Sequence, residues 1–139
     1  MSKPPATAES IAAARAHLAQ VCRDPIKTLR ETTPGVVSAT VATSDGFTLA
    51  STLTTRVEAD KLSATAGSIN ALGAALTRQA GRSAPVNLML ESENGKVVSM
   101  SVSGLKDAAV LTVVTSEAAI LGDLLWACRK ACERIALAA

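Results

Sequence analysis

The sequence predicts an α+β fold in which antiparallel strands are flanked by helices. Two observations support this prediction: short alternating runs joined by tight Asp-Gly and Asn-Gly turns, and longer segments in which apolar residues recur every three or four positions. The expected order is helix, two strands, helix, three strands, helix. Because strands joined by tight turns pair antiparallel, a parallel nucleotide-binding sheet is excluded.

Size and composition place the chain among globular proteins. Its 139 residues suffice for one compact domain, and 48% hydrophobic against 19% charged residues exclude a disordered chain. The longest apolar runs are too short to cross a membrane, so no membrane partner is expected. A net charge of +2, without a cluster of basic residues and with almost no aromatic residues, argues against nucleic acid as a partner.

The cysteines and the first residues predict a reducing, cytoplasmic location. MSKPPATAES has no apolar core followed by a cleavage site, so no signal peptide is expected. Cys22, Cys128 and Cys132 are odd in number and lie in apolar helical contexts, which disfavours a disulfide framework. Cys128 and Cys132 could hold zinc with Cys22 or His17, but no Cys-x-x-Cys motif accompanies them. We therefore expect buried thiols and neither a metal nor a cofactor.

Two short helices are expected before the first strand. Apolar residues recur at helical spacing from Ala8 to Val21. Asp24-Pro25 then restarts the pattern, because Asp caps a helix and Pro suits its first position, until a Thr-Pro-Gly sequence ends it. The break near Arg23 separates an N-terminal extension, residues 1–23, from the domain proper, residues 24–139.

The next two segments have the pattern of a β-hairpin. Val36 to Thr43 and Phe47 to Leu53 alternate and are rich in β-branched residues. Ser44-Asp45-Gly46 lies between them, and Asp-Gly at such a position is a strong hairpin signal because Gly adopts a positive φ without steric cost. These two strands are therefore expected to pair with each other.

The segment from Asp60 to Ala80 is the helix around which we expect the fold to be organised. Its apolar residues form one helical face, made of Leu62, Ala66, Ile69, Gly73, Leu76 and Ala80. Gly81 suits the left-handed position that ends a helix. The rest of the surface is small and weakly polar, which favours close packing against a helix of another copy or of a partner. A plain alanine-rich, solvated face is the alternative.

Three further strands and a last helix complete the pattern. Val86 to Leu90 and Val97 to Val102 alternate on either side of an Asn-Gly turn. Ala108 to Thr115 is apolar on both faces, which is typical of a strand in the middle of a sheet. The last helix is expected from Glu117 to Ala136, with one residue of the Thr115-Ser116 pair as its cap.

In this order of elements the chain resembles the Roadblock/LC7 family, of which bacterial MglB-type proteins are members. The resemblance covers Asp24 to Ile135. It rests on Pro34-Gly35-Val36, SATVATSDGFTLAST across the hairpin, the small-residue helix from Asp60, VNLMLESENGKVVSMSV and the closing LGDLLWACRKACERI. The resemblance implies a profilin-like sandwich, α-β-β-α-β-β-β-α, in which one five-stranded antiparallel sheet is flanked by helices, here with an extra N-terminal helix.

The resemblance also implies a homodimer. In the family, the third strands pair edge to edge across a two-fold axis and the second helices pack side by side. The interface residues would be Val86, Leu88 and Leu90 on the strand and Ser68, Ala71, Leu72 and Ala75 on the helix. Such pairing would also cover an apolar sheet edge that otherwise promotes aggregation.

The implied function is the binding and regulation of a Ras-like small GTPase, as a GTPase activator or as a scaffold, without a catalytic residue. The sequence itself predicts no enzyme, because it contains neither a glycine-rich nucleotide motif nor a base beside a nucleophile. A small-molecule sensing module and a purely structural dimerisation domain are the alternatives.

Two arginines are candidate partner contacts. Arg56 and Arg82 fall in the expected loops on either side of the central helix. An arginine supplied in trans can accelerate GTP hydrolysis, and a solvated surface charge is the alternative interpretation.

Trp126 is a third candidate contact. It lies more than about 120° from the apolar stripe of the last helix at 100° per residue, so something other than the sheet must cover it. We expect the N-terminal helix to do so through Ile11, Leu18 and Val21. A partner-binding role is the rival interpretation, because Trp is enriched in such sites.

Overall fold

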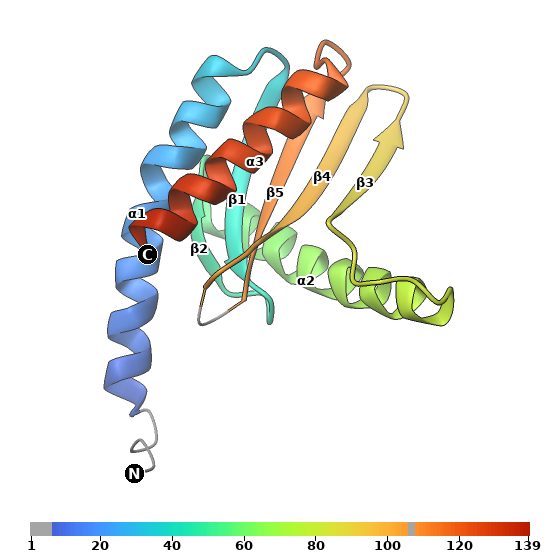
Figure 1. The fold of residues 1–139 in the computed structure, drawn as a ribbon. Coiled ribbons are helices and arrows are strands. Elements are labelled where there is room, and N and C mark those ends of the chain that lie inside the picture. The colour runs from blue at the N-terminus through green and yellow to red at the C-terminus, as the bar shows by residue number, and fades with distance from the viewer. Residues whose placement is uncertain (1–6, 106–107) are drawn as a thin grey trace.

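Five antiparallel strands form one sheet in the order β2-β1-β5-β4-β3, with α1 and α3 on one face and α2 on the other (Figure 1). The computed structural model describes residues 7–105 and 108–139. The strands are β1 (Val36–Thr43), β2 (Thr48–Ser51), β3 (Asn87–Ser92), β4 (Gly95–Val102) and β5 (Ala109–Ser116). The helices are α1 (Ala8–Thr32), α2 (Arg56–Gln79) and α3 (Leu121–Ala138). The predicted fold class and element order are confirmed, and β5 is the central strand as expected.

The main core lies between the sheet and the pair α1 and α3. Its fully buried side chains come from all of these elements: Cys22, Val41, Val98, Leu111, Val113, Leu124, Cys128 and Ile135. The opposite face of the sheet, under α2, is rich in hydroxyl groups instead. Thr48 Oγ1 and Ser63 Oγ lie 2.7 Å apart, and Ser99 Oγ and Thr112 Oγ1 lie 3.1 Å apart. Each buried hydroxyl group therefore has a partner, as burial requires.

The β1–β2 hairpin forms at the predicted Asp-Gly turn. The Thr43 N–H donates a hydrogen bond to the Phe47 carbonyl at 2.8 Å, and Gly46 has a φ of 95°. The turn also packs against α2, since a Cβ added to Gly67 would lie 3.1 Å from the Ser44 carbonyl oxygen. Part of the small-residue surface of α2 thus serves contact with its own hairpin rather than with another helix.

The two N-terminal helices expected from the sequence form one continuous helix, so the predicted break near Arg23 is wrong. Pro25 lies inside α1. Its neighbours on the same face, Cys22, Ile26 and Leu29, are buried against α3 and the sheet. Burial on both sides of the proline keeps the helix in line, and the proline removes only one hydrogen bond. Residues 1–6 of the predicted extension lie outside the described residues.

The last helix begins later than predicted. α3 starts at Leu121 instead of Glu117, and its cap is Ile120, which makes no side-chain capping bond. The preceding turn is set by Gly35, which has a φ of 88° and touches the buried Ala119: a Cβ on Gly35 would lie 2.5 Å from the Ala119 nitrogen. A long-range contact therefore overrides the local capping signal.

The central helix begins at Arg56, earlier than expected, and Thr55 Oγ1 caps it by accepting a bond from the Glu58 N–H at 3.2 Å. It ends as predicted: Gly81 has a φ of 72°. The predicted apolar face is buried only in part. Ala66 is buried, whereas Leu76 is 67% exposed, because the second half of α2 extends past the sheet (Figure 1).

Candidate interaction surfaces

The candidate functional sites of the described residues are surfaces. Within 7–105 and 108–139, no group of three or more metal-ligating side chains is placed to hold an ion. Nor is any helix in these ranges both long and apolar enough to cross a membrane. The candidate sites are therefore the exposed apolar and charged surfaces.

The three thiols lie together in the core. Cys22, Cys128 and Cys132 are buried and unbridged. Burial raises the pKa of Cys22 and of Cys128 to about 11 and that of Cys132 to about 12. They remain protonated near neutral pH, which makes them packing groups and poor nucleophiles.

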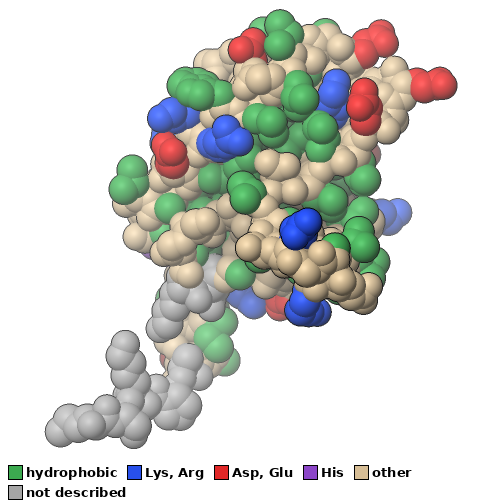
Figure 2. Space-filling model, turned by 45° about the vertical axis from the view of Figure 1, so that its right-hand side comes forward, with side chains coloured by type: hydrophobic (Ala, Val, Ile, Leu, Met, Phe, Trp, Pro, Cys, Tyr) green, Lys and Arg blue, Asp and Glu red, His purple; other side chains and the backbone are tan. Residues whose placement is uncertain are grey.

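An exposed apolar surface lies over the second half of α2 and the β3 edge. We call it the α2–β3 surface. Its exposed side chains are Leu72, Leu76 and Leu90. Val86 and Met89 are exposed at the same edge but on the side of the sheet that α3 covers: Val86 lines a hollow with residues of α3, and Met89 pairs with the core residue Val98. Figure 2 looks toward this side of the molecule and shows hydrophobic side chains gathered there. Exposed patches of this kind mark binding sites in soluble proteins.

A small apolar hollow of about 180 Å³ separates α2 from the sheet beneath this surface. Leu62 and Ile69 of α2 line it on one side, and Leu88 and Leu90 of β3 on the other. α2 and β3 approach each other at Gly73, where a Cβ would lie 4.0 Å from Leu88 Cδ1, an ordinary van der Waals distance. Within the described residues β3 pairs only with β4, so its outer backbone edge is unpaired there.

The predicted interface residues all lie on this side of the molecule. Ser68, Ala71 and Leu72 are exposed on α2, and Ala75 is half-buried. On the strand side, Val86 precedes β3 and is exposed, and Leu88 and Leu90 belong to β3 itself.

Sequence reasoning missed Leu76 as part of this surface. The spacing of Leu76 predicts a core residue, because periodicity does not show where a sheet ends.

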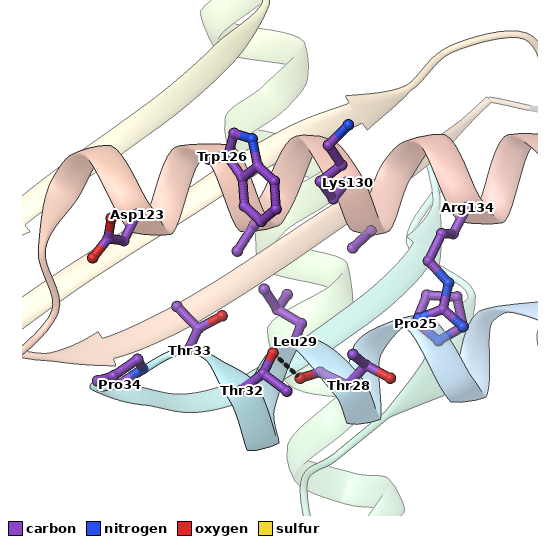
Figure 3. Close-up of a pocket in the computed structure, with 12 residues that line it drawn as sticks. Pro25, Thr28, Leu29, Thr32, Thr33, Pro34, Asp123, Trp126, Lys130 and Arg134 are labelled. Carbon is purple, nitrogen blue, oxygen red and sulfur yellow. Dashed lines mark hydrogen bonds between the residues drawn. The ribbon is translucent and has the colours of Figure 1, made fainter.

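Trp126 lies in a second groove of about 540 Å³, between the last turns of α1 and the first turns of α3 (Figure 3). The ring is 62% exposed, and Lys130 Nζ lies 5.6 Å from its centroid. Thr28 and Thr32 of α1 lie across from it, joined by a hydrogen bond from Thr32 Oγ1 to the Thr28 carbonyl at 2.7 Å.

The expected cover of Trp126 by the N-terminal half of α1 is wrong. Since α1 is one continuous helix, only its last turns pass α3 at the tryptophan, and the N-terminal half continues beyond the sheet (Figure 1). Ile11 instead lines a hollow with Arg15 and Phe47. The role of Trp126 as a partner contact stays a prediction.

The two candidate arginines lie at opposite ends of α2. Arg56 is the first residue of the helix, not part of a loop, and its Nε lies 3.2 Å from Asp60 Oδ1. Arg82 follows the helix, where its N–H donates to the Thr77 carbonyl at 2.8 Å. A 24-residue helix spans about 36 Å, so one protomer cannot bring both side chains to one point.

Comparison with known families identifies this arrangement. Residues 26–115 match the family model described as the Roadblock/LC7 domain. The chain belongs to the Roadblock/LC7 family. The match ends with β5, so the domain's α3 and most of α1 lie outside it.

Solved structures share the Roadblock/LC7 fold at low sequence identity. The gliding protein MglB from Thermus thermophilus is 21% identical, with a TM-score of 0.73, over 91% of this chain and 91% of that chain. MglB from Myxococcus xanthus is 16% identical, with a TM-score of 0.70, over 86% of this chain and 92% of that chain. Profilin IB from Acanthamoeba castellanii is 19% identical, with a TM-score of 0.51, over 82% and 95%. No curated protein matches the sequence.

Proposed function

We propose that this Roadblock/LC7 domain is a non-catalytic, homodimeric interaction module of the cytoplasm that binds and regulates a Ras-like small GTPase. The observation that carries the proposal is the α2–β3 surface: an unpaired strand edge beside exposed leucines on a helix that extends past its own sheet. The family resemblance supports the GTPase as the partner class. The regulation would be GTPase activation or scaffolding.

A second copy is the partner that suits the α2–β3 surface best. A two-fold axis beside β3 would pair the two strand edges and place the two α2 helices next to each other. Leu72 is 69% and Leu76 67% exposed, and burying a leucine fully contributes about 1.5–3 kcal/mol. Because each residue occurs twice in such an interface, these side chains alone offset a large part of the association cost.

A GTPase would then bind a composite surface made by both copies. Arg56 and Arg82 lie far apart on one α2, but two antiparallel helices would place the Arg56 of one copy near the Arg82 end of the other. Arg82 is exposed, and Arg56 already pairs with Asp60. Regulation would come from holding the GTPase in one conformation.

The dimer is tested by light scattering coupled to size-exclusion chromatography. Leu72→Glu should shift the protein to the monomer, with a dissociation constant raised about 100-fold or more, because two carboxylates would be buried at the axis. Leu137→Glu is the matched control, since Leu137 is 87% exposed at the end of α3. A monomeric wild type at high micromolar concentration would refute the dimer.

The GTPase is tested by affinity capture from lysate in the presence of GDP or of a non-hydrolysable GTP analogue. A small GTPase retained in only one nucleotide state, and released by Arg82→Glu or Trp126→Ala, supports the proposal. Measuring its GTP hydrolysis with and without the domain then separates an activator from a scaffold. Retention of no GTPase in either state favours the purely structural dimer.

A further inference from the structure

The opposite edge of the sheet carries a groove of a different character. The outer edge of β2 lies between α1 and the start of α2, above a hollow of about 490 Å³. Four basic side chains line it: Arg23, Lys27, Arg30 and Arg56. We call it the basic groove. Three of them, Arg23, Lys27 and Arg30, lie four and three positions apart on α1. Sequence reasoning missed this shared helix face because it placed a break in the helix near Arg23.

Most of this charge has no counter-ion within the described part of the chain. Arg56 pairs with Asp60, at 3.2 Å. Arg23, Lys27 and Arg30 make no salt bridge there. The groove therefore attracts anionic groups, and closely placed like charges favour a ligand that carries several negative charges.

The floor of the groove is a strand with an unused hydrogen-bonding edge. Among the described residues, β2 pairs only with β1. The Thr52 N–H donates to the Ala39 carbonyl at 2.9 Å, toward β1. Since backbone groups alternate in direction along an antiparallel strand, those of the preceding residue, Ser51, point away from β1 and into the groove. An added strand would find a donor and an acceptor there.

The basic charges also disfavour pairing of this edge with a second copy of itself. Charged side chains beside an edge strand oppose association with a like-charged edge. The same charges favour a strand of opposite sign. Backbone donors on the floor and cations on the walls together suit an extended peptide better than a compact anion, which would use the cations alone.

We propose that the basic groove binds an extended, acidic peptide segment of a partner protein, which adds to the sheet as a sixth strand beside β2. Main-chain hydrogen bonds to Ser51 would hold the peptide, and carboxylates would pair with Arg23, Lys27 and Arg30. The site lies apart from the proposed dimer interface, because β2 and β3 lie at opposite edges of the sheet. It shares Arg56 with the proposed GTPase contacts.

The probe is a fluorescein-labelled peptide of alternating Glu and Val, titrated by anisotropy into the full chain at low salt. We expect saturable binding with a dissociation constant below about 1 mM, and this constant should increase with the salt concentration. A peptide of alternating Lys and Val should not bind. In an extended peptide only every second backbone N–H points toward β2 and can donate a hydrogen bond to it. N-methylation of the peptide at these positions should abolish binding. N-methylation at the alternate positions should leave binding nearly unchanged.

Matched variants locate the site. Arg23→Glu with Lys27→Glu should weaken binding about tenfold or more, since attraction becomes repulsion. Arg129→Glu with Arg134→Glu changes the net charge equally on α3 and should have little effect. In backbone amide spectra of the full chain, the peptide should shift the signal of Ser51 more than those of β3.

Three results would overturn the proposal: no saturable binding, binding that tolerates both methylation patterns, or equal losses in the two double variants. Oligomeric state and GTPase capture are unaffected by any of them, so this inference can fail without the proposed function.

Discussion

The two edges of this sheet differ in chemistry although they belong to the same five strands. At β3 the neighbouring surface is apolar, with Leu72, Leu76 and Leu90 exposed. At β2 it is cationic, with Arg23 and Lys27 on the groove wall. An apolar strand edge favours pairing with the same edge of a second copy, whereas a charged edge opposes such pairing. The difference supports the two proposals together, in which one edge pairs with a second copy and the other binds an unlike partner.

The largest expected effect comes from giving the β3 edge the charge of the β2 edge. Leu90→Lys should raise the dimer dissociation constant about 100- to 1000-fold, because the axis brings two ammonium groups together where two leucines would pack. Sedimentation equilibrium measures it, with Leu137→Lys as the control. An unchanged dimer would show that β3 is not the self-pairing edge.

The core that both edges share should lose stability at alkaline pH. Cys22 and Cys128 have a pKa raised from 9.0 to about 11, so the folded chain binds these protons more tightly than the unfolded chain does. The contribution of these thiols to the free energy of unfolding should be constant below pH 9 and then fall up to pH 11, by at most about 1.4 kcal/mol per pH unit for each thiol.

Urea unfolding at pH 8, 9 and 10, at one protein concentration, measures this slope. Cys128→Ala should lower stability at pH 8 but give a shallower decline above pH 9. An equal decline in both proteins would mean that the thiols do not set the slope.

A smaller effect is expected where α2 holds the β2 edge in place. Thr48 of β2 and Ser63 of α2 share a buried hydrogen bond of 2.7 Å. Ser63→Ala should cost about 1–3 kcal/mol, because it leaves the Thr48 hydroxyl group unpaired, whereas Thr48→Val with Ser63→Ala should cost less. Thermal unfolding of the three variants measures the difference. A double variant that is the least stable would contradict this reading of the contact.

The smallest effect on stability should come from the basic groove itself. Arg23→Ala and Lys27→Ala each remove an exposed side chain without a salt bridge, so each should change the free energy of unfolding by less than about 0.5 kcal/mol. Chemical denaturation measures this. A large loss would mean that these cations serve folding and would weaken the contrast between the two edges.

The features that the sequence predicted correctly are those with local causes. Asp45-Gly46 specifies its hairpin because the turn needs a positive φ, and the apolar faces of Ala109–Ser116 specify a central strand. Gly81 ends α2 for the same local reason. These elements require no knowledge of the rest of the fold.

The features that were missed depend on contacts between distant segments. Pro25 stays inside α1 because its neighbours are buried on α3, and α3 starts late because Ala119 lies under Gly35. Leu76 has the spacing of a core residue but lies beyond the sheet. The basic groove joins three residues on one face of α1 to Arg56 of α2, and no local pattern predicts that these two helices meet beside β2.

The cationic edge also limits how large an assembly can grow. In the proposed dimer the two β3 edges are used up, and both ends of the ten-stranded sheet are β2 edges that repel one another, so polymerisation stops at two copies. With strands about 4.8 Å apart, the two grooves would lie roughly 45 Å from each other. A partner with two acidic segments on a linker of that reach would gain avidity from binding both ends at once.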